Sequence, residues 1–298
     1  MQKQLQVGIT GASGFLGQAV VEALGRAGHR CVAFSRSPER PVHGCAEVRR
    51  FAPGEPPDLE GLDAVVHLAG ESLMGRPSKR KREAIMESRR AGTHALVDGL
   101  LAAGARGPKT LVSASAVGFY GDKGEATVDE NAPAGSGFLA EVTQVWEAEA
   151  RRAETGAARV VILRFGVIVG EHGGMLKALH PVFRLGLGAT LGSGRQWVSW
   201  VDVRDAARLA VFALENGQVH GVLNATSPVP LRASDFTWAM ARRLHCRAPW
   251  RIPSWIIRVL FGPMAGIFLD SQRVLPRRAE ALGFAFEHRG VGAGAETK

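Results

Sequence analysis

Three glycines near the amino end could bring the backbone close to a phosphate group. They lie in the segment Gln6-Val-Gly-Ile-Thr-Gly-Ala-Ser-Gly-Phe-Leu-Gly17, between an apolar run and a helical pattern. Gly11 would allow a tight turn, Gly14 would admit a pyrophosphate, and Gly17 would let the helix pack against the strand. The cofactor-binding residues expected in this loop are Gly11, Ser13, Gly14, Phe15, Leu16 and Gly17. A glycine turn with only a structural role is the alternative.

The residue after the second expected strand would meet the adenosine ribose. An acidic residue there holds the ribose hydroxyls of NAD, but this chain has Ser35-Arg36, with Arg40 close behind. A guanidinium group can bind a 2′-phosphate through two hydrogen bonds. Arg36 and Arg40 therefore favour NADP(H) as the cofactor, although both could simply belong to a basic surface.

Strands and helices that could position these residues alternate along most of the chain. Strands are expected at residues 5–9, 31–35, 48–51, 63–67, 110–113, 159–165 and 221–225. Helices are expected between them, at residues 81–103, 138–154 and 201–214 among others, with Asp202 as an N-cap. This alternation predicts an α/β fold with a doubly wound parallel Rossmann sheet.

Two stretches do not continue the alternation, and they indicate a second, smaller domain. We expect residues 1–170 plus 201–226 to form the dinucleotide-binding Rossmann domain. Residues 171–200 plus 227–298 would form a small C-terminal lobe that covers the substrate. The tail from residue 288 to 298 is rich in glycine and alanine and does not predict a helix.

Composition and charge limit the class of partner. The net charge of +9 raises nucleic acid as a partner, but the densest basic run, Arg76–Arg82, has no interleaved aromatic residues. The three cysteines lack Cys-x-x-Cys spacing, which favours a reducing, cytoplasmic compartment. The histidines lack metal-ligand spacing. We therefore expect no nucleic-acid partner, no membrane partner and no structural metal.

Several motifs in order resemble the extended short-chain dehydrogenase/reductase superfamily. They are Thr10-Gly-Ala-Ser-Gly-Phe-Leu-Gly17, His67-Leu-Ala-Gly70, Tyr120-Gly-Asp122, Trp200-Val-Asp-Val-Arg-Asp205 and Gly221-Val-Leu-Asn224. Further runs resemble a subgroup of atypical epimerase/dehydratase-like proteins of unknown substrate, also labelled putative cell-division inhibitors. Those runs are Leu68-Ala-Gly-Glu71, Glu87-Ser-Arg89, Trp146-Glu147, Phe183-Arg-Leu-Gly-Leu-Gly188, Gly192-Ser-Gly-Arg-Gln196 and Ala281-Leu-Gly-Phe284.

The resemblance implies the fold and the cofactor, but no particular reaction. Small residues after the fourth strand would let the cofactor lie against the carboxyl edge of the sheet. Arg89 stands where relatives often have asparagine. The cofactor-binding residues added in this way are Leu68, Ala69, Gly70, Arg89, Ser113 and Phe165.

The chain departs from the superfamily at its catalytic pair. A Tyr-x-x-x-Lys pair normally moves the proton, but Phe138 and Val142 stand where we expect that pair. The superfamily's catalytic Ser or Thr is matched by Ser115. The catalytic candidates are Ser115, Tyr120 and Glu71, of which Tyr120 is the only tyrosine in the chain. Alternatively, Tyr120 packs under its loop in a structural role.

Two functions from different classes fit these residues. One is an NADP(H)-dependent oxidoreductase or epimerase-like enzyme that acts on a small polar substrate. The other is a catalytically silent NADPH-binding sensor that acts through a protein partner. A standard nucleotide-sugar epimerase is disfavoured because the proton relay is missing. A homodimer is compatible with either function.

Overall fold

The structure is a computed structural model that describes residues 3–170 and 173–291 of the 298-residue chain. Within the described residues the chain forms two compact units. The first contains the residues up to 115, with 142–163 and 207–223, and the second contains 116–141, 164–206 and the residues from 224 onward. The domain boundaries expected from the sequence remain a prediction. The tail residues 292–298 lie outside the described residues.

The first unit is built on a sheet that, in the described chain, has seven strands in the order β12-β7-β5-β4-β1-β2-β3. The strands are β1 (Gln6–Thr10), β2 (Arg30–Ser35), β3 (Glu47–Arg50), β4 (Ala64–His67), β5 (Thr110–Ala116), β7 (Arg159–Phe165) and β12 (Gly221–Ala225); the last residues of β5, β7 and β12 belong to the second unit. The pairs β1–β2, β2–β3, β1–β4 and β4–β5 are parallel. This arrangement confirms the predicted α/β class and doubly wound sheet.

The strand order reverses between β1 and β4. From β1 the chain adds β2 and β3 on one side, and it then returns to add β4, β5, β7 and β12 on the other. The loops that leave β1 and β4 therefore diverge and open a crevice at the carboxyl edge. In open parallel sheets, ligands bind at such a switch point.

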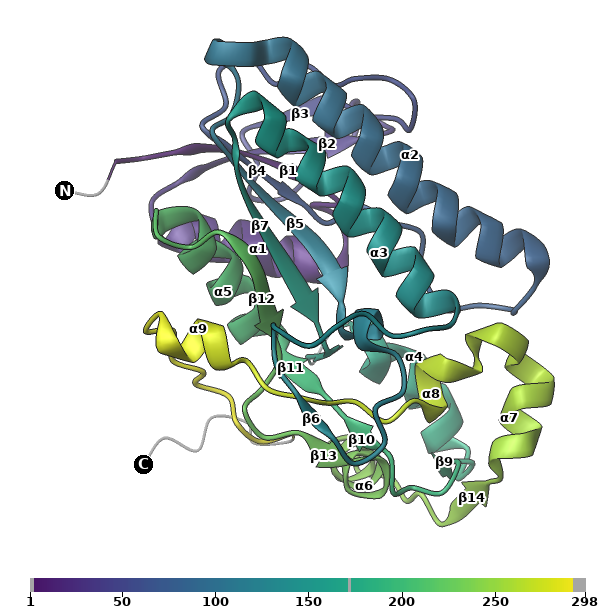
Figure 1. Ribbon diagram of the computed structural model, residues 1–298. Coiled ribbons are helices and arrows are strands. Elements are labelled where there is room, and N and C mark those ends of the chain that lie inside the picture. The colour runs from purple at the N-terminus through teal and green to yellow at the C-terminus, as the bar shows by residue number, and fades with distance from the viewer. Residues whose placement is uncertain (1–2, 171–172, 292–298) are drawn as a thin grey trace. The chain divides into compact units, whose positions relative to one another are not determined.

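Helices cover both faces of the sheet (Figure 1). They are α1 (Phe15–Arg26), α2 (Lys79–Ala103), α3 (Phe138–Arg151) and α5 (Val203–Glu215), with short 3₁₀ turns at η1 (Gly104–Arg106) and η3 (Arg152–Gly156). Leu96 and Leu100 of α2 pack against Val65, Leu111 and Ile162 of the strands in one buried cluster. Helices α2 and α3 lie on this face, and α1 and α5 lie on the other (Figure 1). Burial of both sheet faces explains why the inner strands β2, β4, β5 and β7 are mainly apolar, whereas the edge strand β3 carries Glu47, Arg49 and Arg50.

The second unit consists of short strand pairs and helices. Its elements are η2 (Val117–Tyr120), β6 (Thr127–Val128), β8 (Val167–Val169), α4 (Gly174–Arg184), β9 (Ala189–Leu191), β10 (Trp197–Val198), β11 (Trp200–Asp202), β13 (Leu231–Arg232), α6 (Ala233–Arg243), β14 (Trp250–Ile252), α7 (Ser254–Phe261), η4 (Gly262–Ala265), α8 (Gly266–Leu269), β15 (Arg273–Val274) and α9 (Arg277–Ala281). Strands β8 and β11, β9 and β14, and β6 and β15 pair in parallel. Trp200 packs against Phe236 and Met240 in one of its buried clusters.

One expected helix begins later than the sequence pattern suggested. Residues 200–202 form β11 instead, because they pair with β8. Helix α5 begins at Val203, and Oδ1 of Asp202 accepts a hydrogen bond from the N–H of Arg204 at 2.9 Å. Asp202 therefore caps the helix as predicted.

Candidate functional site

The three glycines of the loop after β1 have different roles. Gly11 has a φ of +72°, in the left-handed region, and its carbonyl accepts a hydrogen bond from the N–H of Gly14 at 2.9 Å. A Cβ on Gly17 would lie 2.1 Å from the Gly11 carbonyl oxygen, so this position admits only glycine. A Cβ on Gly14 would meet only that same oxygen, at 3.1 Å. Gly11 and Gly17 therefore shape the turn, and Gly14 leaves space in front of it.

Helix α1 begins at Phe15, directly after that space. The N–H groups of a first helical turn have no acceptor within the helix, and the helix dipole favours an anion there. Gly14 has no Cβ and leaves space in front of the first turn of α1. This arrangement fits a pyrophosphate. Phe15 and Leu16 would contribute backbone N–H groups to it.

A cavity of about 370 Å³ opens beside this loop, entirely within the first unit. It is lined by Gly11, Ser13, Gly14, Phe34, Ser35, Arg36, Phe51, Pro53, Leu68, Ala69, Gly70, Glu71, Ser88 and Gly92. Eight residues singled out from the sequence are among them: Gly11, Ser13, Gly14, Arg36, Leu68, Ala69, Gly70 and Glu71. The cavity lies where β1, β2 and β4 end, which is the switch point of the sheet.

Other expected cofactor-binding residues lie elsewhere. Arg40 is exposed, with its guanidinium 3.8 Å from Glu39, and it does not line the cavity. Arg89 and Ser113 are buried in the first unit, and Phe165 is buried in the second. Of the arginines near the second strand, only Arg36 thus contributes to this cavity.

A buried hydrogen-bonded chain joins the ends of β1 and β4. The hydroxyl of Thr10 accepts hydrogen bonds from the N–H groups of Leu68 and Ala69, both at 3.1 Å. With both lone pairs engaged, it donates its proton to Nδ1 of His67, 2.7 Å away. His67 must then carry its own proton on Nε2, which donates to the Thr93 hydroxyl at 3.0 Å. The sequence did not predict this hydrogen-bonded network. The one feature that could have indicated it is a histidine at the end of an apolar strand.

Glu71 is held by helix α2 at three points. Lys81 donates a hydrogen bond to its carboxylate at 2.6 Å, and the Glu71 N–H donates to the Ser88 hydroxyl at 3.0 Å. Arg89 donates to its backbone carbonyl at 2.9 Å. The Lys81 hydrogen bond is the main cause that lowers the pKa of Glu71, and Arg36 and Arg89 add to the effect. Glu71 is therefore an ionised carboxylate whose place is fixed.

Arg89 has a positioning role in this arrangement. It is buried, and burial lowers its pKa to about 10. Its guanidinium carbon lies 5.0 Å from the ring centre of Trp146, and a Cβ on Gly70 would lie 3.3 Å from it. The Arg89 guanidinium therefore packs against Gly70, one of the small residues that follow β4.

Ser115 lies near the end of β5 and donates a hydrogen bond to Oε1 of Glu147 on α3 at 2.7 Å. Both side chains are buried. Phe138 and Val142, which replace the Tyr–Lys pair, lie on the same helix. Glu147 was not a candidate from the sequence, because the two residues are 32 positions apart and their contact depends on the packing of α3 against the sheet.

Tyr120 is completely buried in the second unit. Its hydroxyl donates to Oδ1 of Asn224 at 2.7 Å and accepts from Nη1 of Arg164 at 3.0 Å. Burial raises the pKa of Tyr120, against the lowering effect of Arg164. These contacts favour the structural alternative for this phenol.

A group of potential metal ligands also occurs in the second unit. Asp205, Glu287 and His288 place ligand atoms within 4.8 Å of one another. The Asp205 carboxylate already accepts the N–H groups of Glu287 at 3.2 Å and of His288 at 2.8 Å. Asp205 therefore ties the chain after Phe286 to the start of α5.

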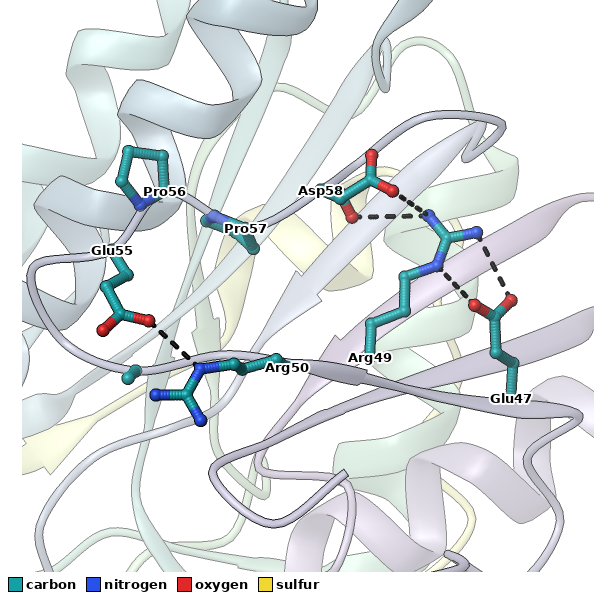
Figure 2. A pocket seen from close by; sticks show the side chains of 8 residues that line it. Glu47, Arg49, Arg50, Glu55, Pro56, Pro57 and Asp58 are labelled. Atoms are coloured by element: carbon teal, nitrogen blue, oxygen red, sulfur yellow. Dashed lines mark hydrogen bonds and ion pairs between the residues drawn. The ribbon is translucent and has the colours of Figure 1, made fainter. Parts of the chain in front are cut away.

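A second cavity, of about 380 Å³, lies at the outer edge of the sheet beside β3 (Figure 2). Its arginines already have carboxylate partners: Arg49 Nε lies 2.9 Å from Glu47, and Arg50 Nε lies 3.2 Å from Glu55. Figure 2 shows Arg49 turned toward Glu47 and Asp58. Because these cations are internally paired and no predicted site residue lines the cavity, the cavity at the switch point is the better candidate.

The fold and the glycine loop define a Rossmann protein of the short-chain dehydrogenase/reductase class. Residues 7–225 match the family described as "NAD dependent epimerase/dehydratase family", and residues 252–293 match a domain of unknown function, DUF1731. The chain belongs to this epimerase/dehydratase family, which confirms the resemblance inferred from its motifs.

Individual proteins agree with this assignment along nearly the whole chain. "Epimerase family protein Mb2239" of Mycobacterium bovis is 38% identical, covering 96% of this chain and 95% of that protein. "Epimerase family protein SDR39U1 homolog, chloroplastic" of Arabidopsis thaliana is 36% identical, covering 97% and 85%. The crystal structure of human epimerase family protein SDR39U1 with NADPH matches with a TM-score of 0.84 and 30% identity, covering 97% of each chain.

Among the described residues, no helix combines the length and the apolar character that crossing a membrane requires.

Proposed function

We propose that the first unit binds NADP(H) in the cavity at the switch point of the sheet. The observation that carries this proposal is Arg36, which lines the cavity directly after β2, where an acidic residue would favour NAD. The pyrophosphate would be held by the loop between Gly11 and Gly17, and the 2′-phosphate by Arg36. The human relative whose structure contains NADPH supports the same choice.

We further propose that the protein is an oxidoreductase or epimerase-like enzyme that acts on a small polar substrate. The bound nicotinamide would supply hydride transfer. Ser115 would hold a substrate hydroxyl or carbonyl, and Glu147, 2.7 Å from its hydroxyl, would take up a proton through it in oxidation and return that proton in reduction. This pair would replace the missing Tyr-x-x-x-Lys chemistry.

A catalytically silent NADPH sensor is the second candidate. Two observations favour it: Phe138 and Val142 cannot transfer protons, and the Tyr120 hydroxyl is already engaged by Asn224 and Arg164. Such a protein would keep the cofactor cavity and report its occupancy to a protein partner.

The nucleotide released from the purified, heat-denatured protein tests the cofactor proposal. Mass spectrometry should find NADP⁺ or NADPH in the unmodified protein after it has been loaded with equal NAD(H) and NADP(H) and desalted. A matched Gly14→Val variant should release neither. Recovery of NAD(H) alone from the unmodified protein would contradict the proposal.

A further inference from the structure

The cavity that we assign to NADP(H) contains an acidic side chain that should weaken NADP(H) binding. Glu71 and Arg36 both line it, and the charge of Arg36 helps to lower the pKa of Glu71. An ionised carboxylate beside Arg36 would repel a 2′-phosphate. It could instead accept a hydrogen bond from a free ribose hydroxyl, which is how acidic residues favour NAD.

Lys81 counteracts this carboxylate. Its ammonium group lies 2.6 Å from Oε1 of Glu71, and its side chain is only 17% exposed, compared with 45% for Glu71. Lys81 belongs to the first turn of α2, where its own N–H is capped by the hydroxyl of Ser78 at 3.1 Å. The ammonium group is thus held against Glu71 by the start of the helix.

The backbone of Glu71 is fixed as well. Ser88 and Arg89, both on α2, bind its N–H and its carbonyl. The carboxylate is therefore carried by an anchored backbone at the cavity, and Lys81 binds it there at 2.6 Å. Lys81 forms this hydrogen bond as a cation, so it neutralises the negative charge of Glu71 inside the cavity.

We propose that the Lys81–Glu71 ion pair is a specificity determinant for the cofactor: by neutralising Glu71, Lys81 allows a 2′-phosphate to bind beside Arg36. This inference rests on the proposed function of the cavity. This role requires no proton transfer by either residue. The charges of the pair change the relative affinity of the cavity for a cofactor with a 2′-phosphate and a cofactor with a 2′-hydroxyl.

Titration of NADPH and NADH into four proteins tests the pair. The proteins are the unmodified chain, Lys81→Met, Glu71→Gln and the double variant, and the readout is the ratio of the two dissociation constants. Lys81→Met should lower the preference for NADPH by about tenfold, because it exposes the Glu71 charge. Glu71→Gln should raise that preference. The double variant, with the same net charge as the original pair, should return to within about threefold of the unmodified ratio.

Two further variants control for folding and for long-range charge. Lys81→Arg keeps the cation and should keep the ratio. Arg90→Met removes a cation from the same helix, where Arg90 is paired 2.9 Å from Glu87 on the exposed face, and should change the ratio by less than about twofold.

The outcomes separate this inference from the proposed function. A ratio in Lys81→Met equal to that in Arg90→Met, with NADPH still bound by the unmodified protein, would overturn the inference alone. A double variant as impaired as Lys81→Met would also overturn it, because Lys81 would then act directly on the phosphate. Failure of the unmodified protein to bind either nucleotide would overturn both.

Discussion

The hydroxyl of Thr10 and Nδ1 of His67 lie 2.7 Å apart, in a buried hydrogen bond between the last residues of β1 and β4. These two strands flank the point where the sheet order reverses, and the same hydroxyl holds the backbone of Leu68 and Ala69. The bond therefore fixes the two strand ends between which the candidate cofactor cavity opens.

His67 should make the protein sensitive to mild acid. Burial is the main cause that lowers its pKa to about 4 from 6.5, and the charge of Arg89 adds to the effect. The unfolded chain takes up a proton below pH 6.5 and the folded chain does not, so stability should fall as the pH falls from 6.5 towards 4. At pH 5 this loss amounts to about 2 kcal/mol.

Urea unfolding at pH 7 and at pH 5 measures this loss. A His67→Gln variant should lose about 2 kcal/mol less than the unmodified protein between the two pH values. A His220→Gln variant, changed at an exposed histidine, should behave like the unmodified protein. Equal losses in the unmodified protein and in His67→Gln would show that His67 is not the cause.

The glycines of the first loop should respond differently to substitution. Gly17→Ala places a methyl group against the Gly11 carbonyl oxygen and should cost about 1–3 kcal/mol of unfolding free energy. Gly14→Val should retain most of the stability, because Gly14 has a φ of −76° that any residue can adopt, but it should abolish NADPH binding. Thermal unfolding and nucleotide titration should be run on both. Full NADPH affinity in Gly14→Val would mean that the phosphate site lies elsewhere.

Tyr120 should behave as a structural residue. Tyr120→Phe leaves Asn224 and Arg164 without their shared hydroxyl and should cost about 1–3 kcal/mol, with unchanged NADPH affinity. Because Tyr120 is the only tyrosine, its ionisation can be followed by ultraviolet absorbance, and the raised pKa predicts a transition at higher pH than in a model tyrosine. A transition that moves downward on addition of NADP⁺, with loss of turnover in Tyr120→Phe, would restore its catalytic assignment.

Short-range features of this protein could be predicted from the sequence. A strand, a glycine turn and a helix follow one another directly at Gly11, and each depends on neighbouring residues. The roles expected for Gly11 and Gly17 agree with the observed backbone, because a φ of +72° and a blocked Cβ position are local properties. The alternation of apolar strands and helices predicted the sheet for the same reason.

Long-range pairs could not be predicted in this way. Ser115 and Glu147 are 32 residues apart, and Thr10 and His67 are 57 residues apart. Their contacts depend on which strand lies beside which and on the rotation of a helix on the sheet, and neither follows from spacing. Lys81 illustrates the same limit, since the sequence places it only within the basic run Arg76–Arg82 and does not show that it pairs with Glu71.

Direct titration of both nucleotides measures the preference of the protein for NADPH over NADH. We expect the unmodified protein to bind NADPH at least about tenfold more tightly, because Arg36 can pair with the 2′-phosphate. Arg36→Asp should reduce or reverse that ratio, and Arg40→Asp, at an exposed arginine outside the cavity, should change it much less. Equal affinities for the two nucleotides in the unmodified protein would contradict the assignment of the cavity to NADP(H).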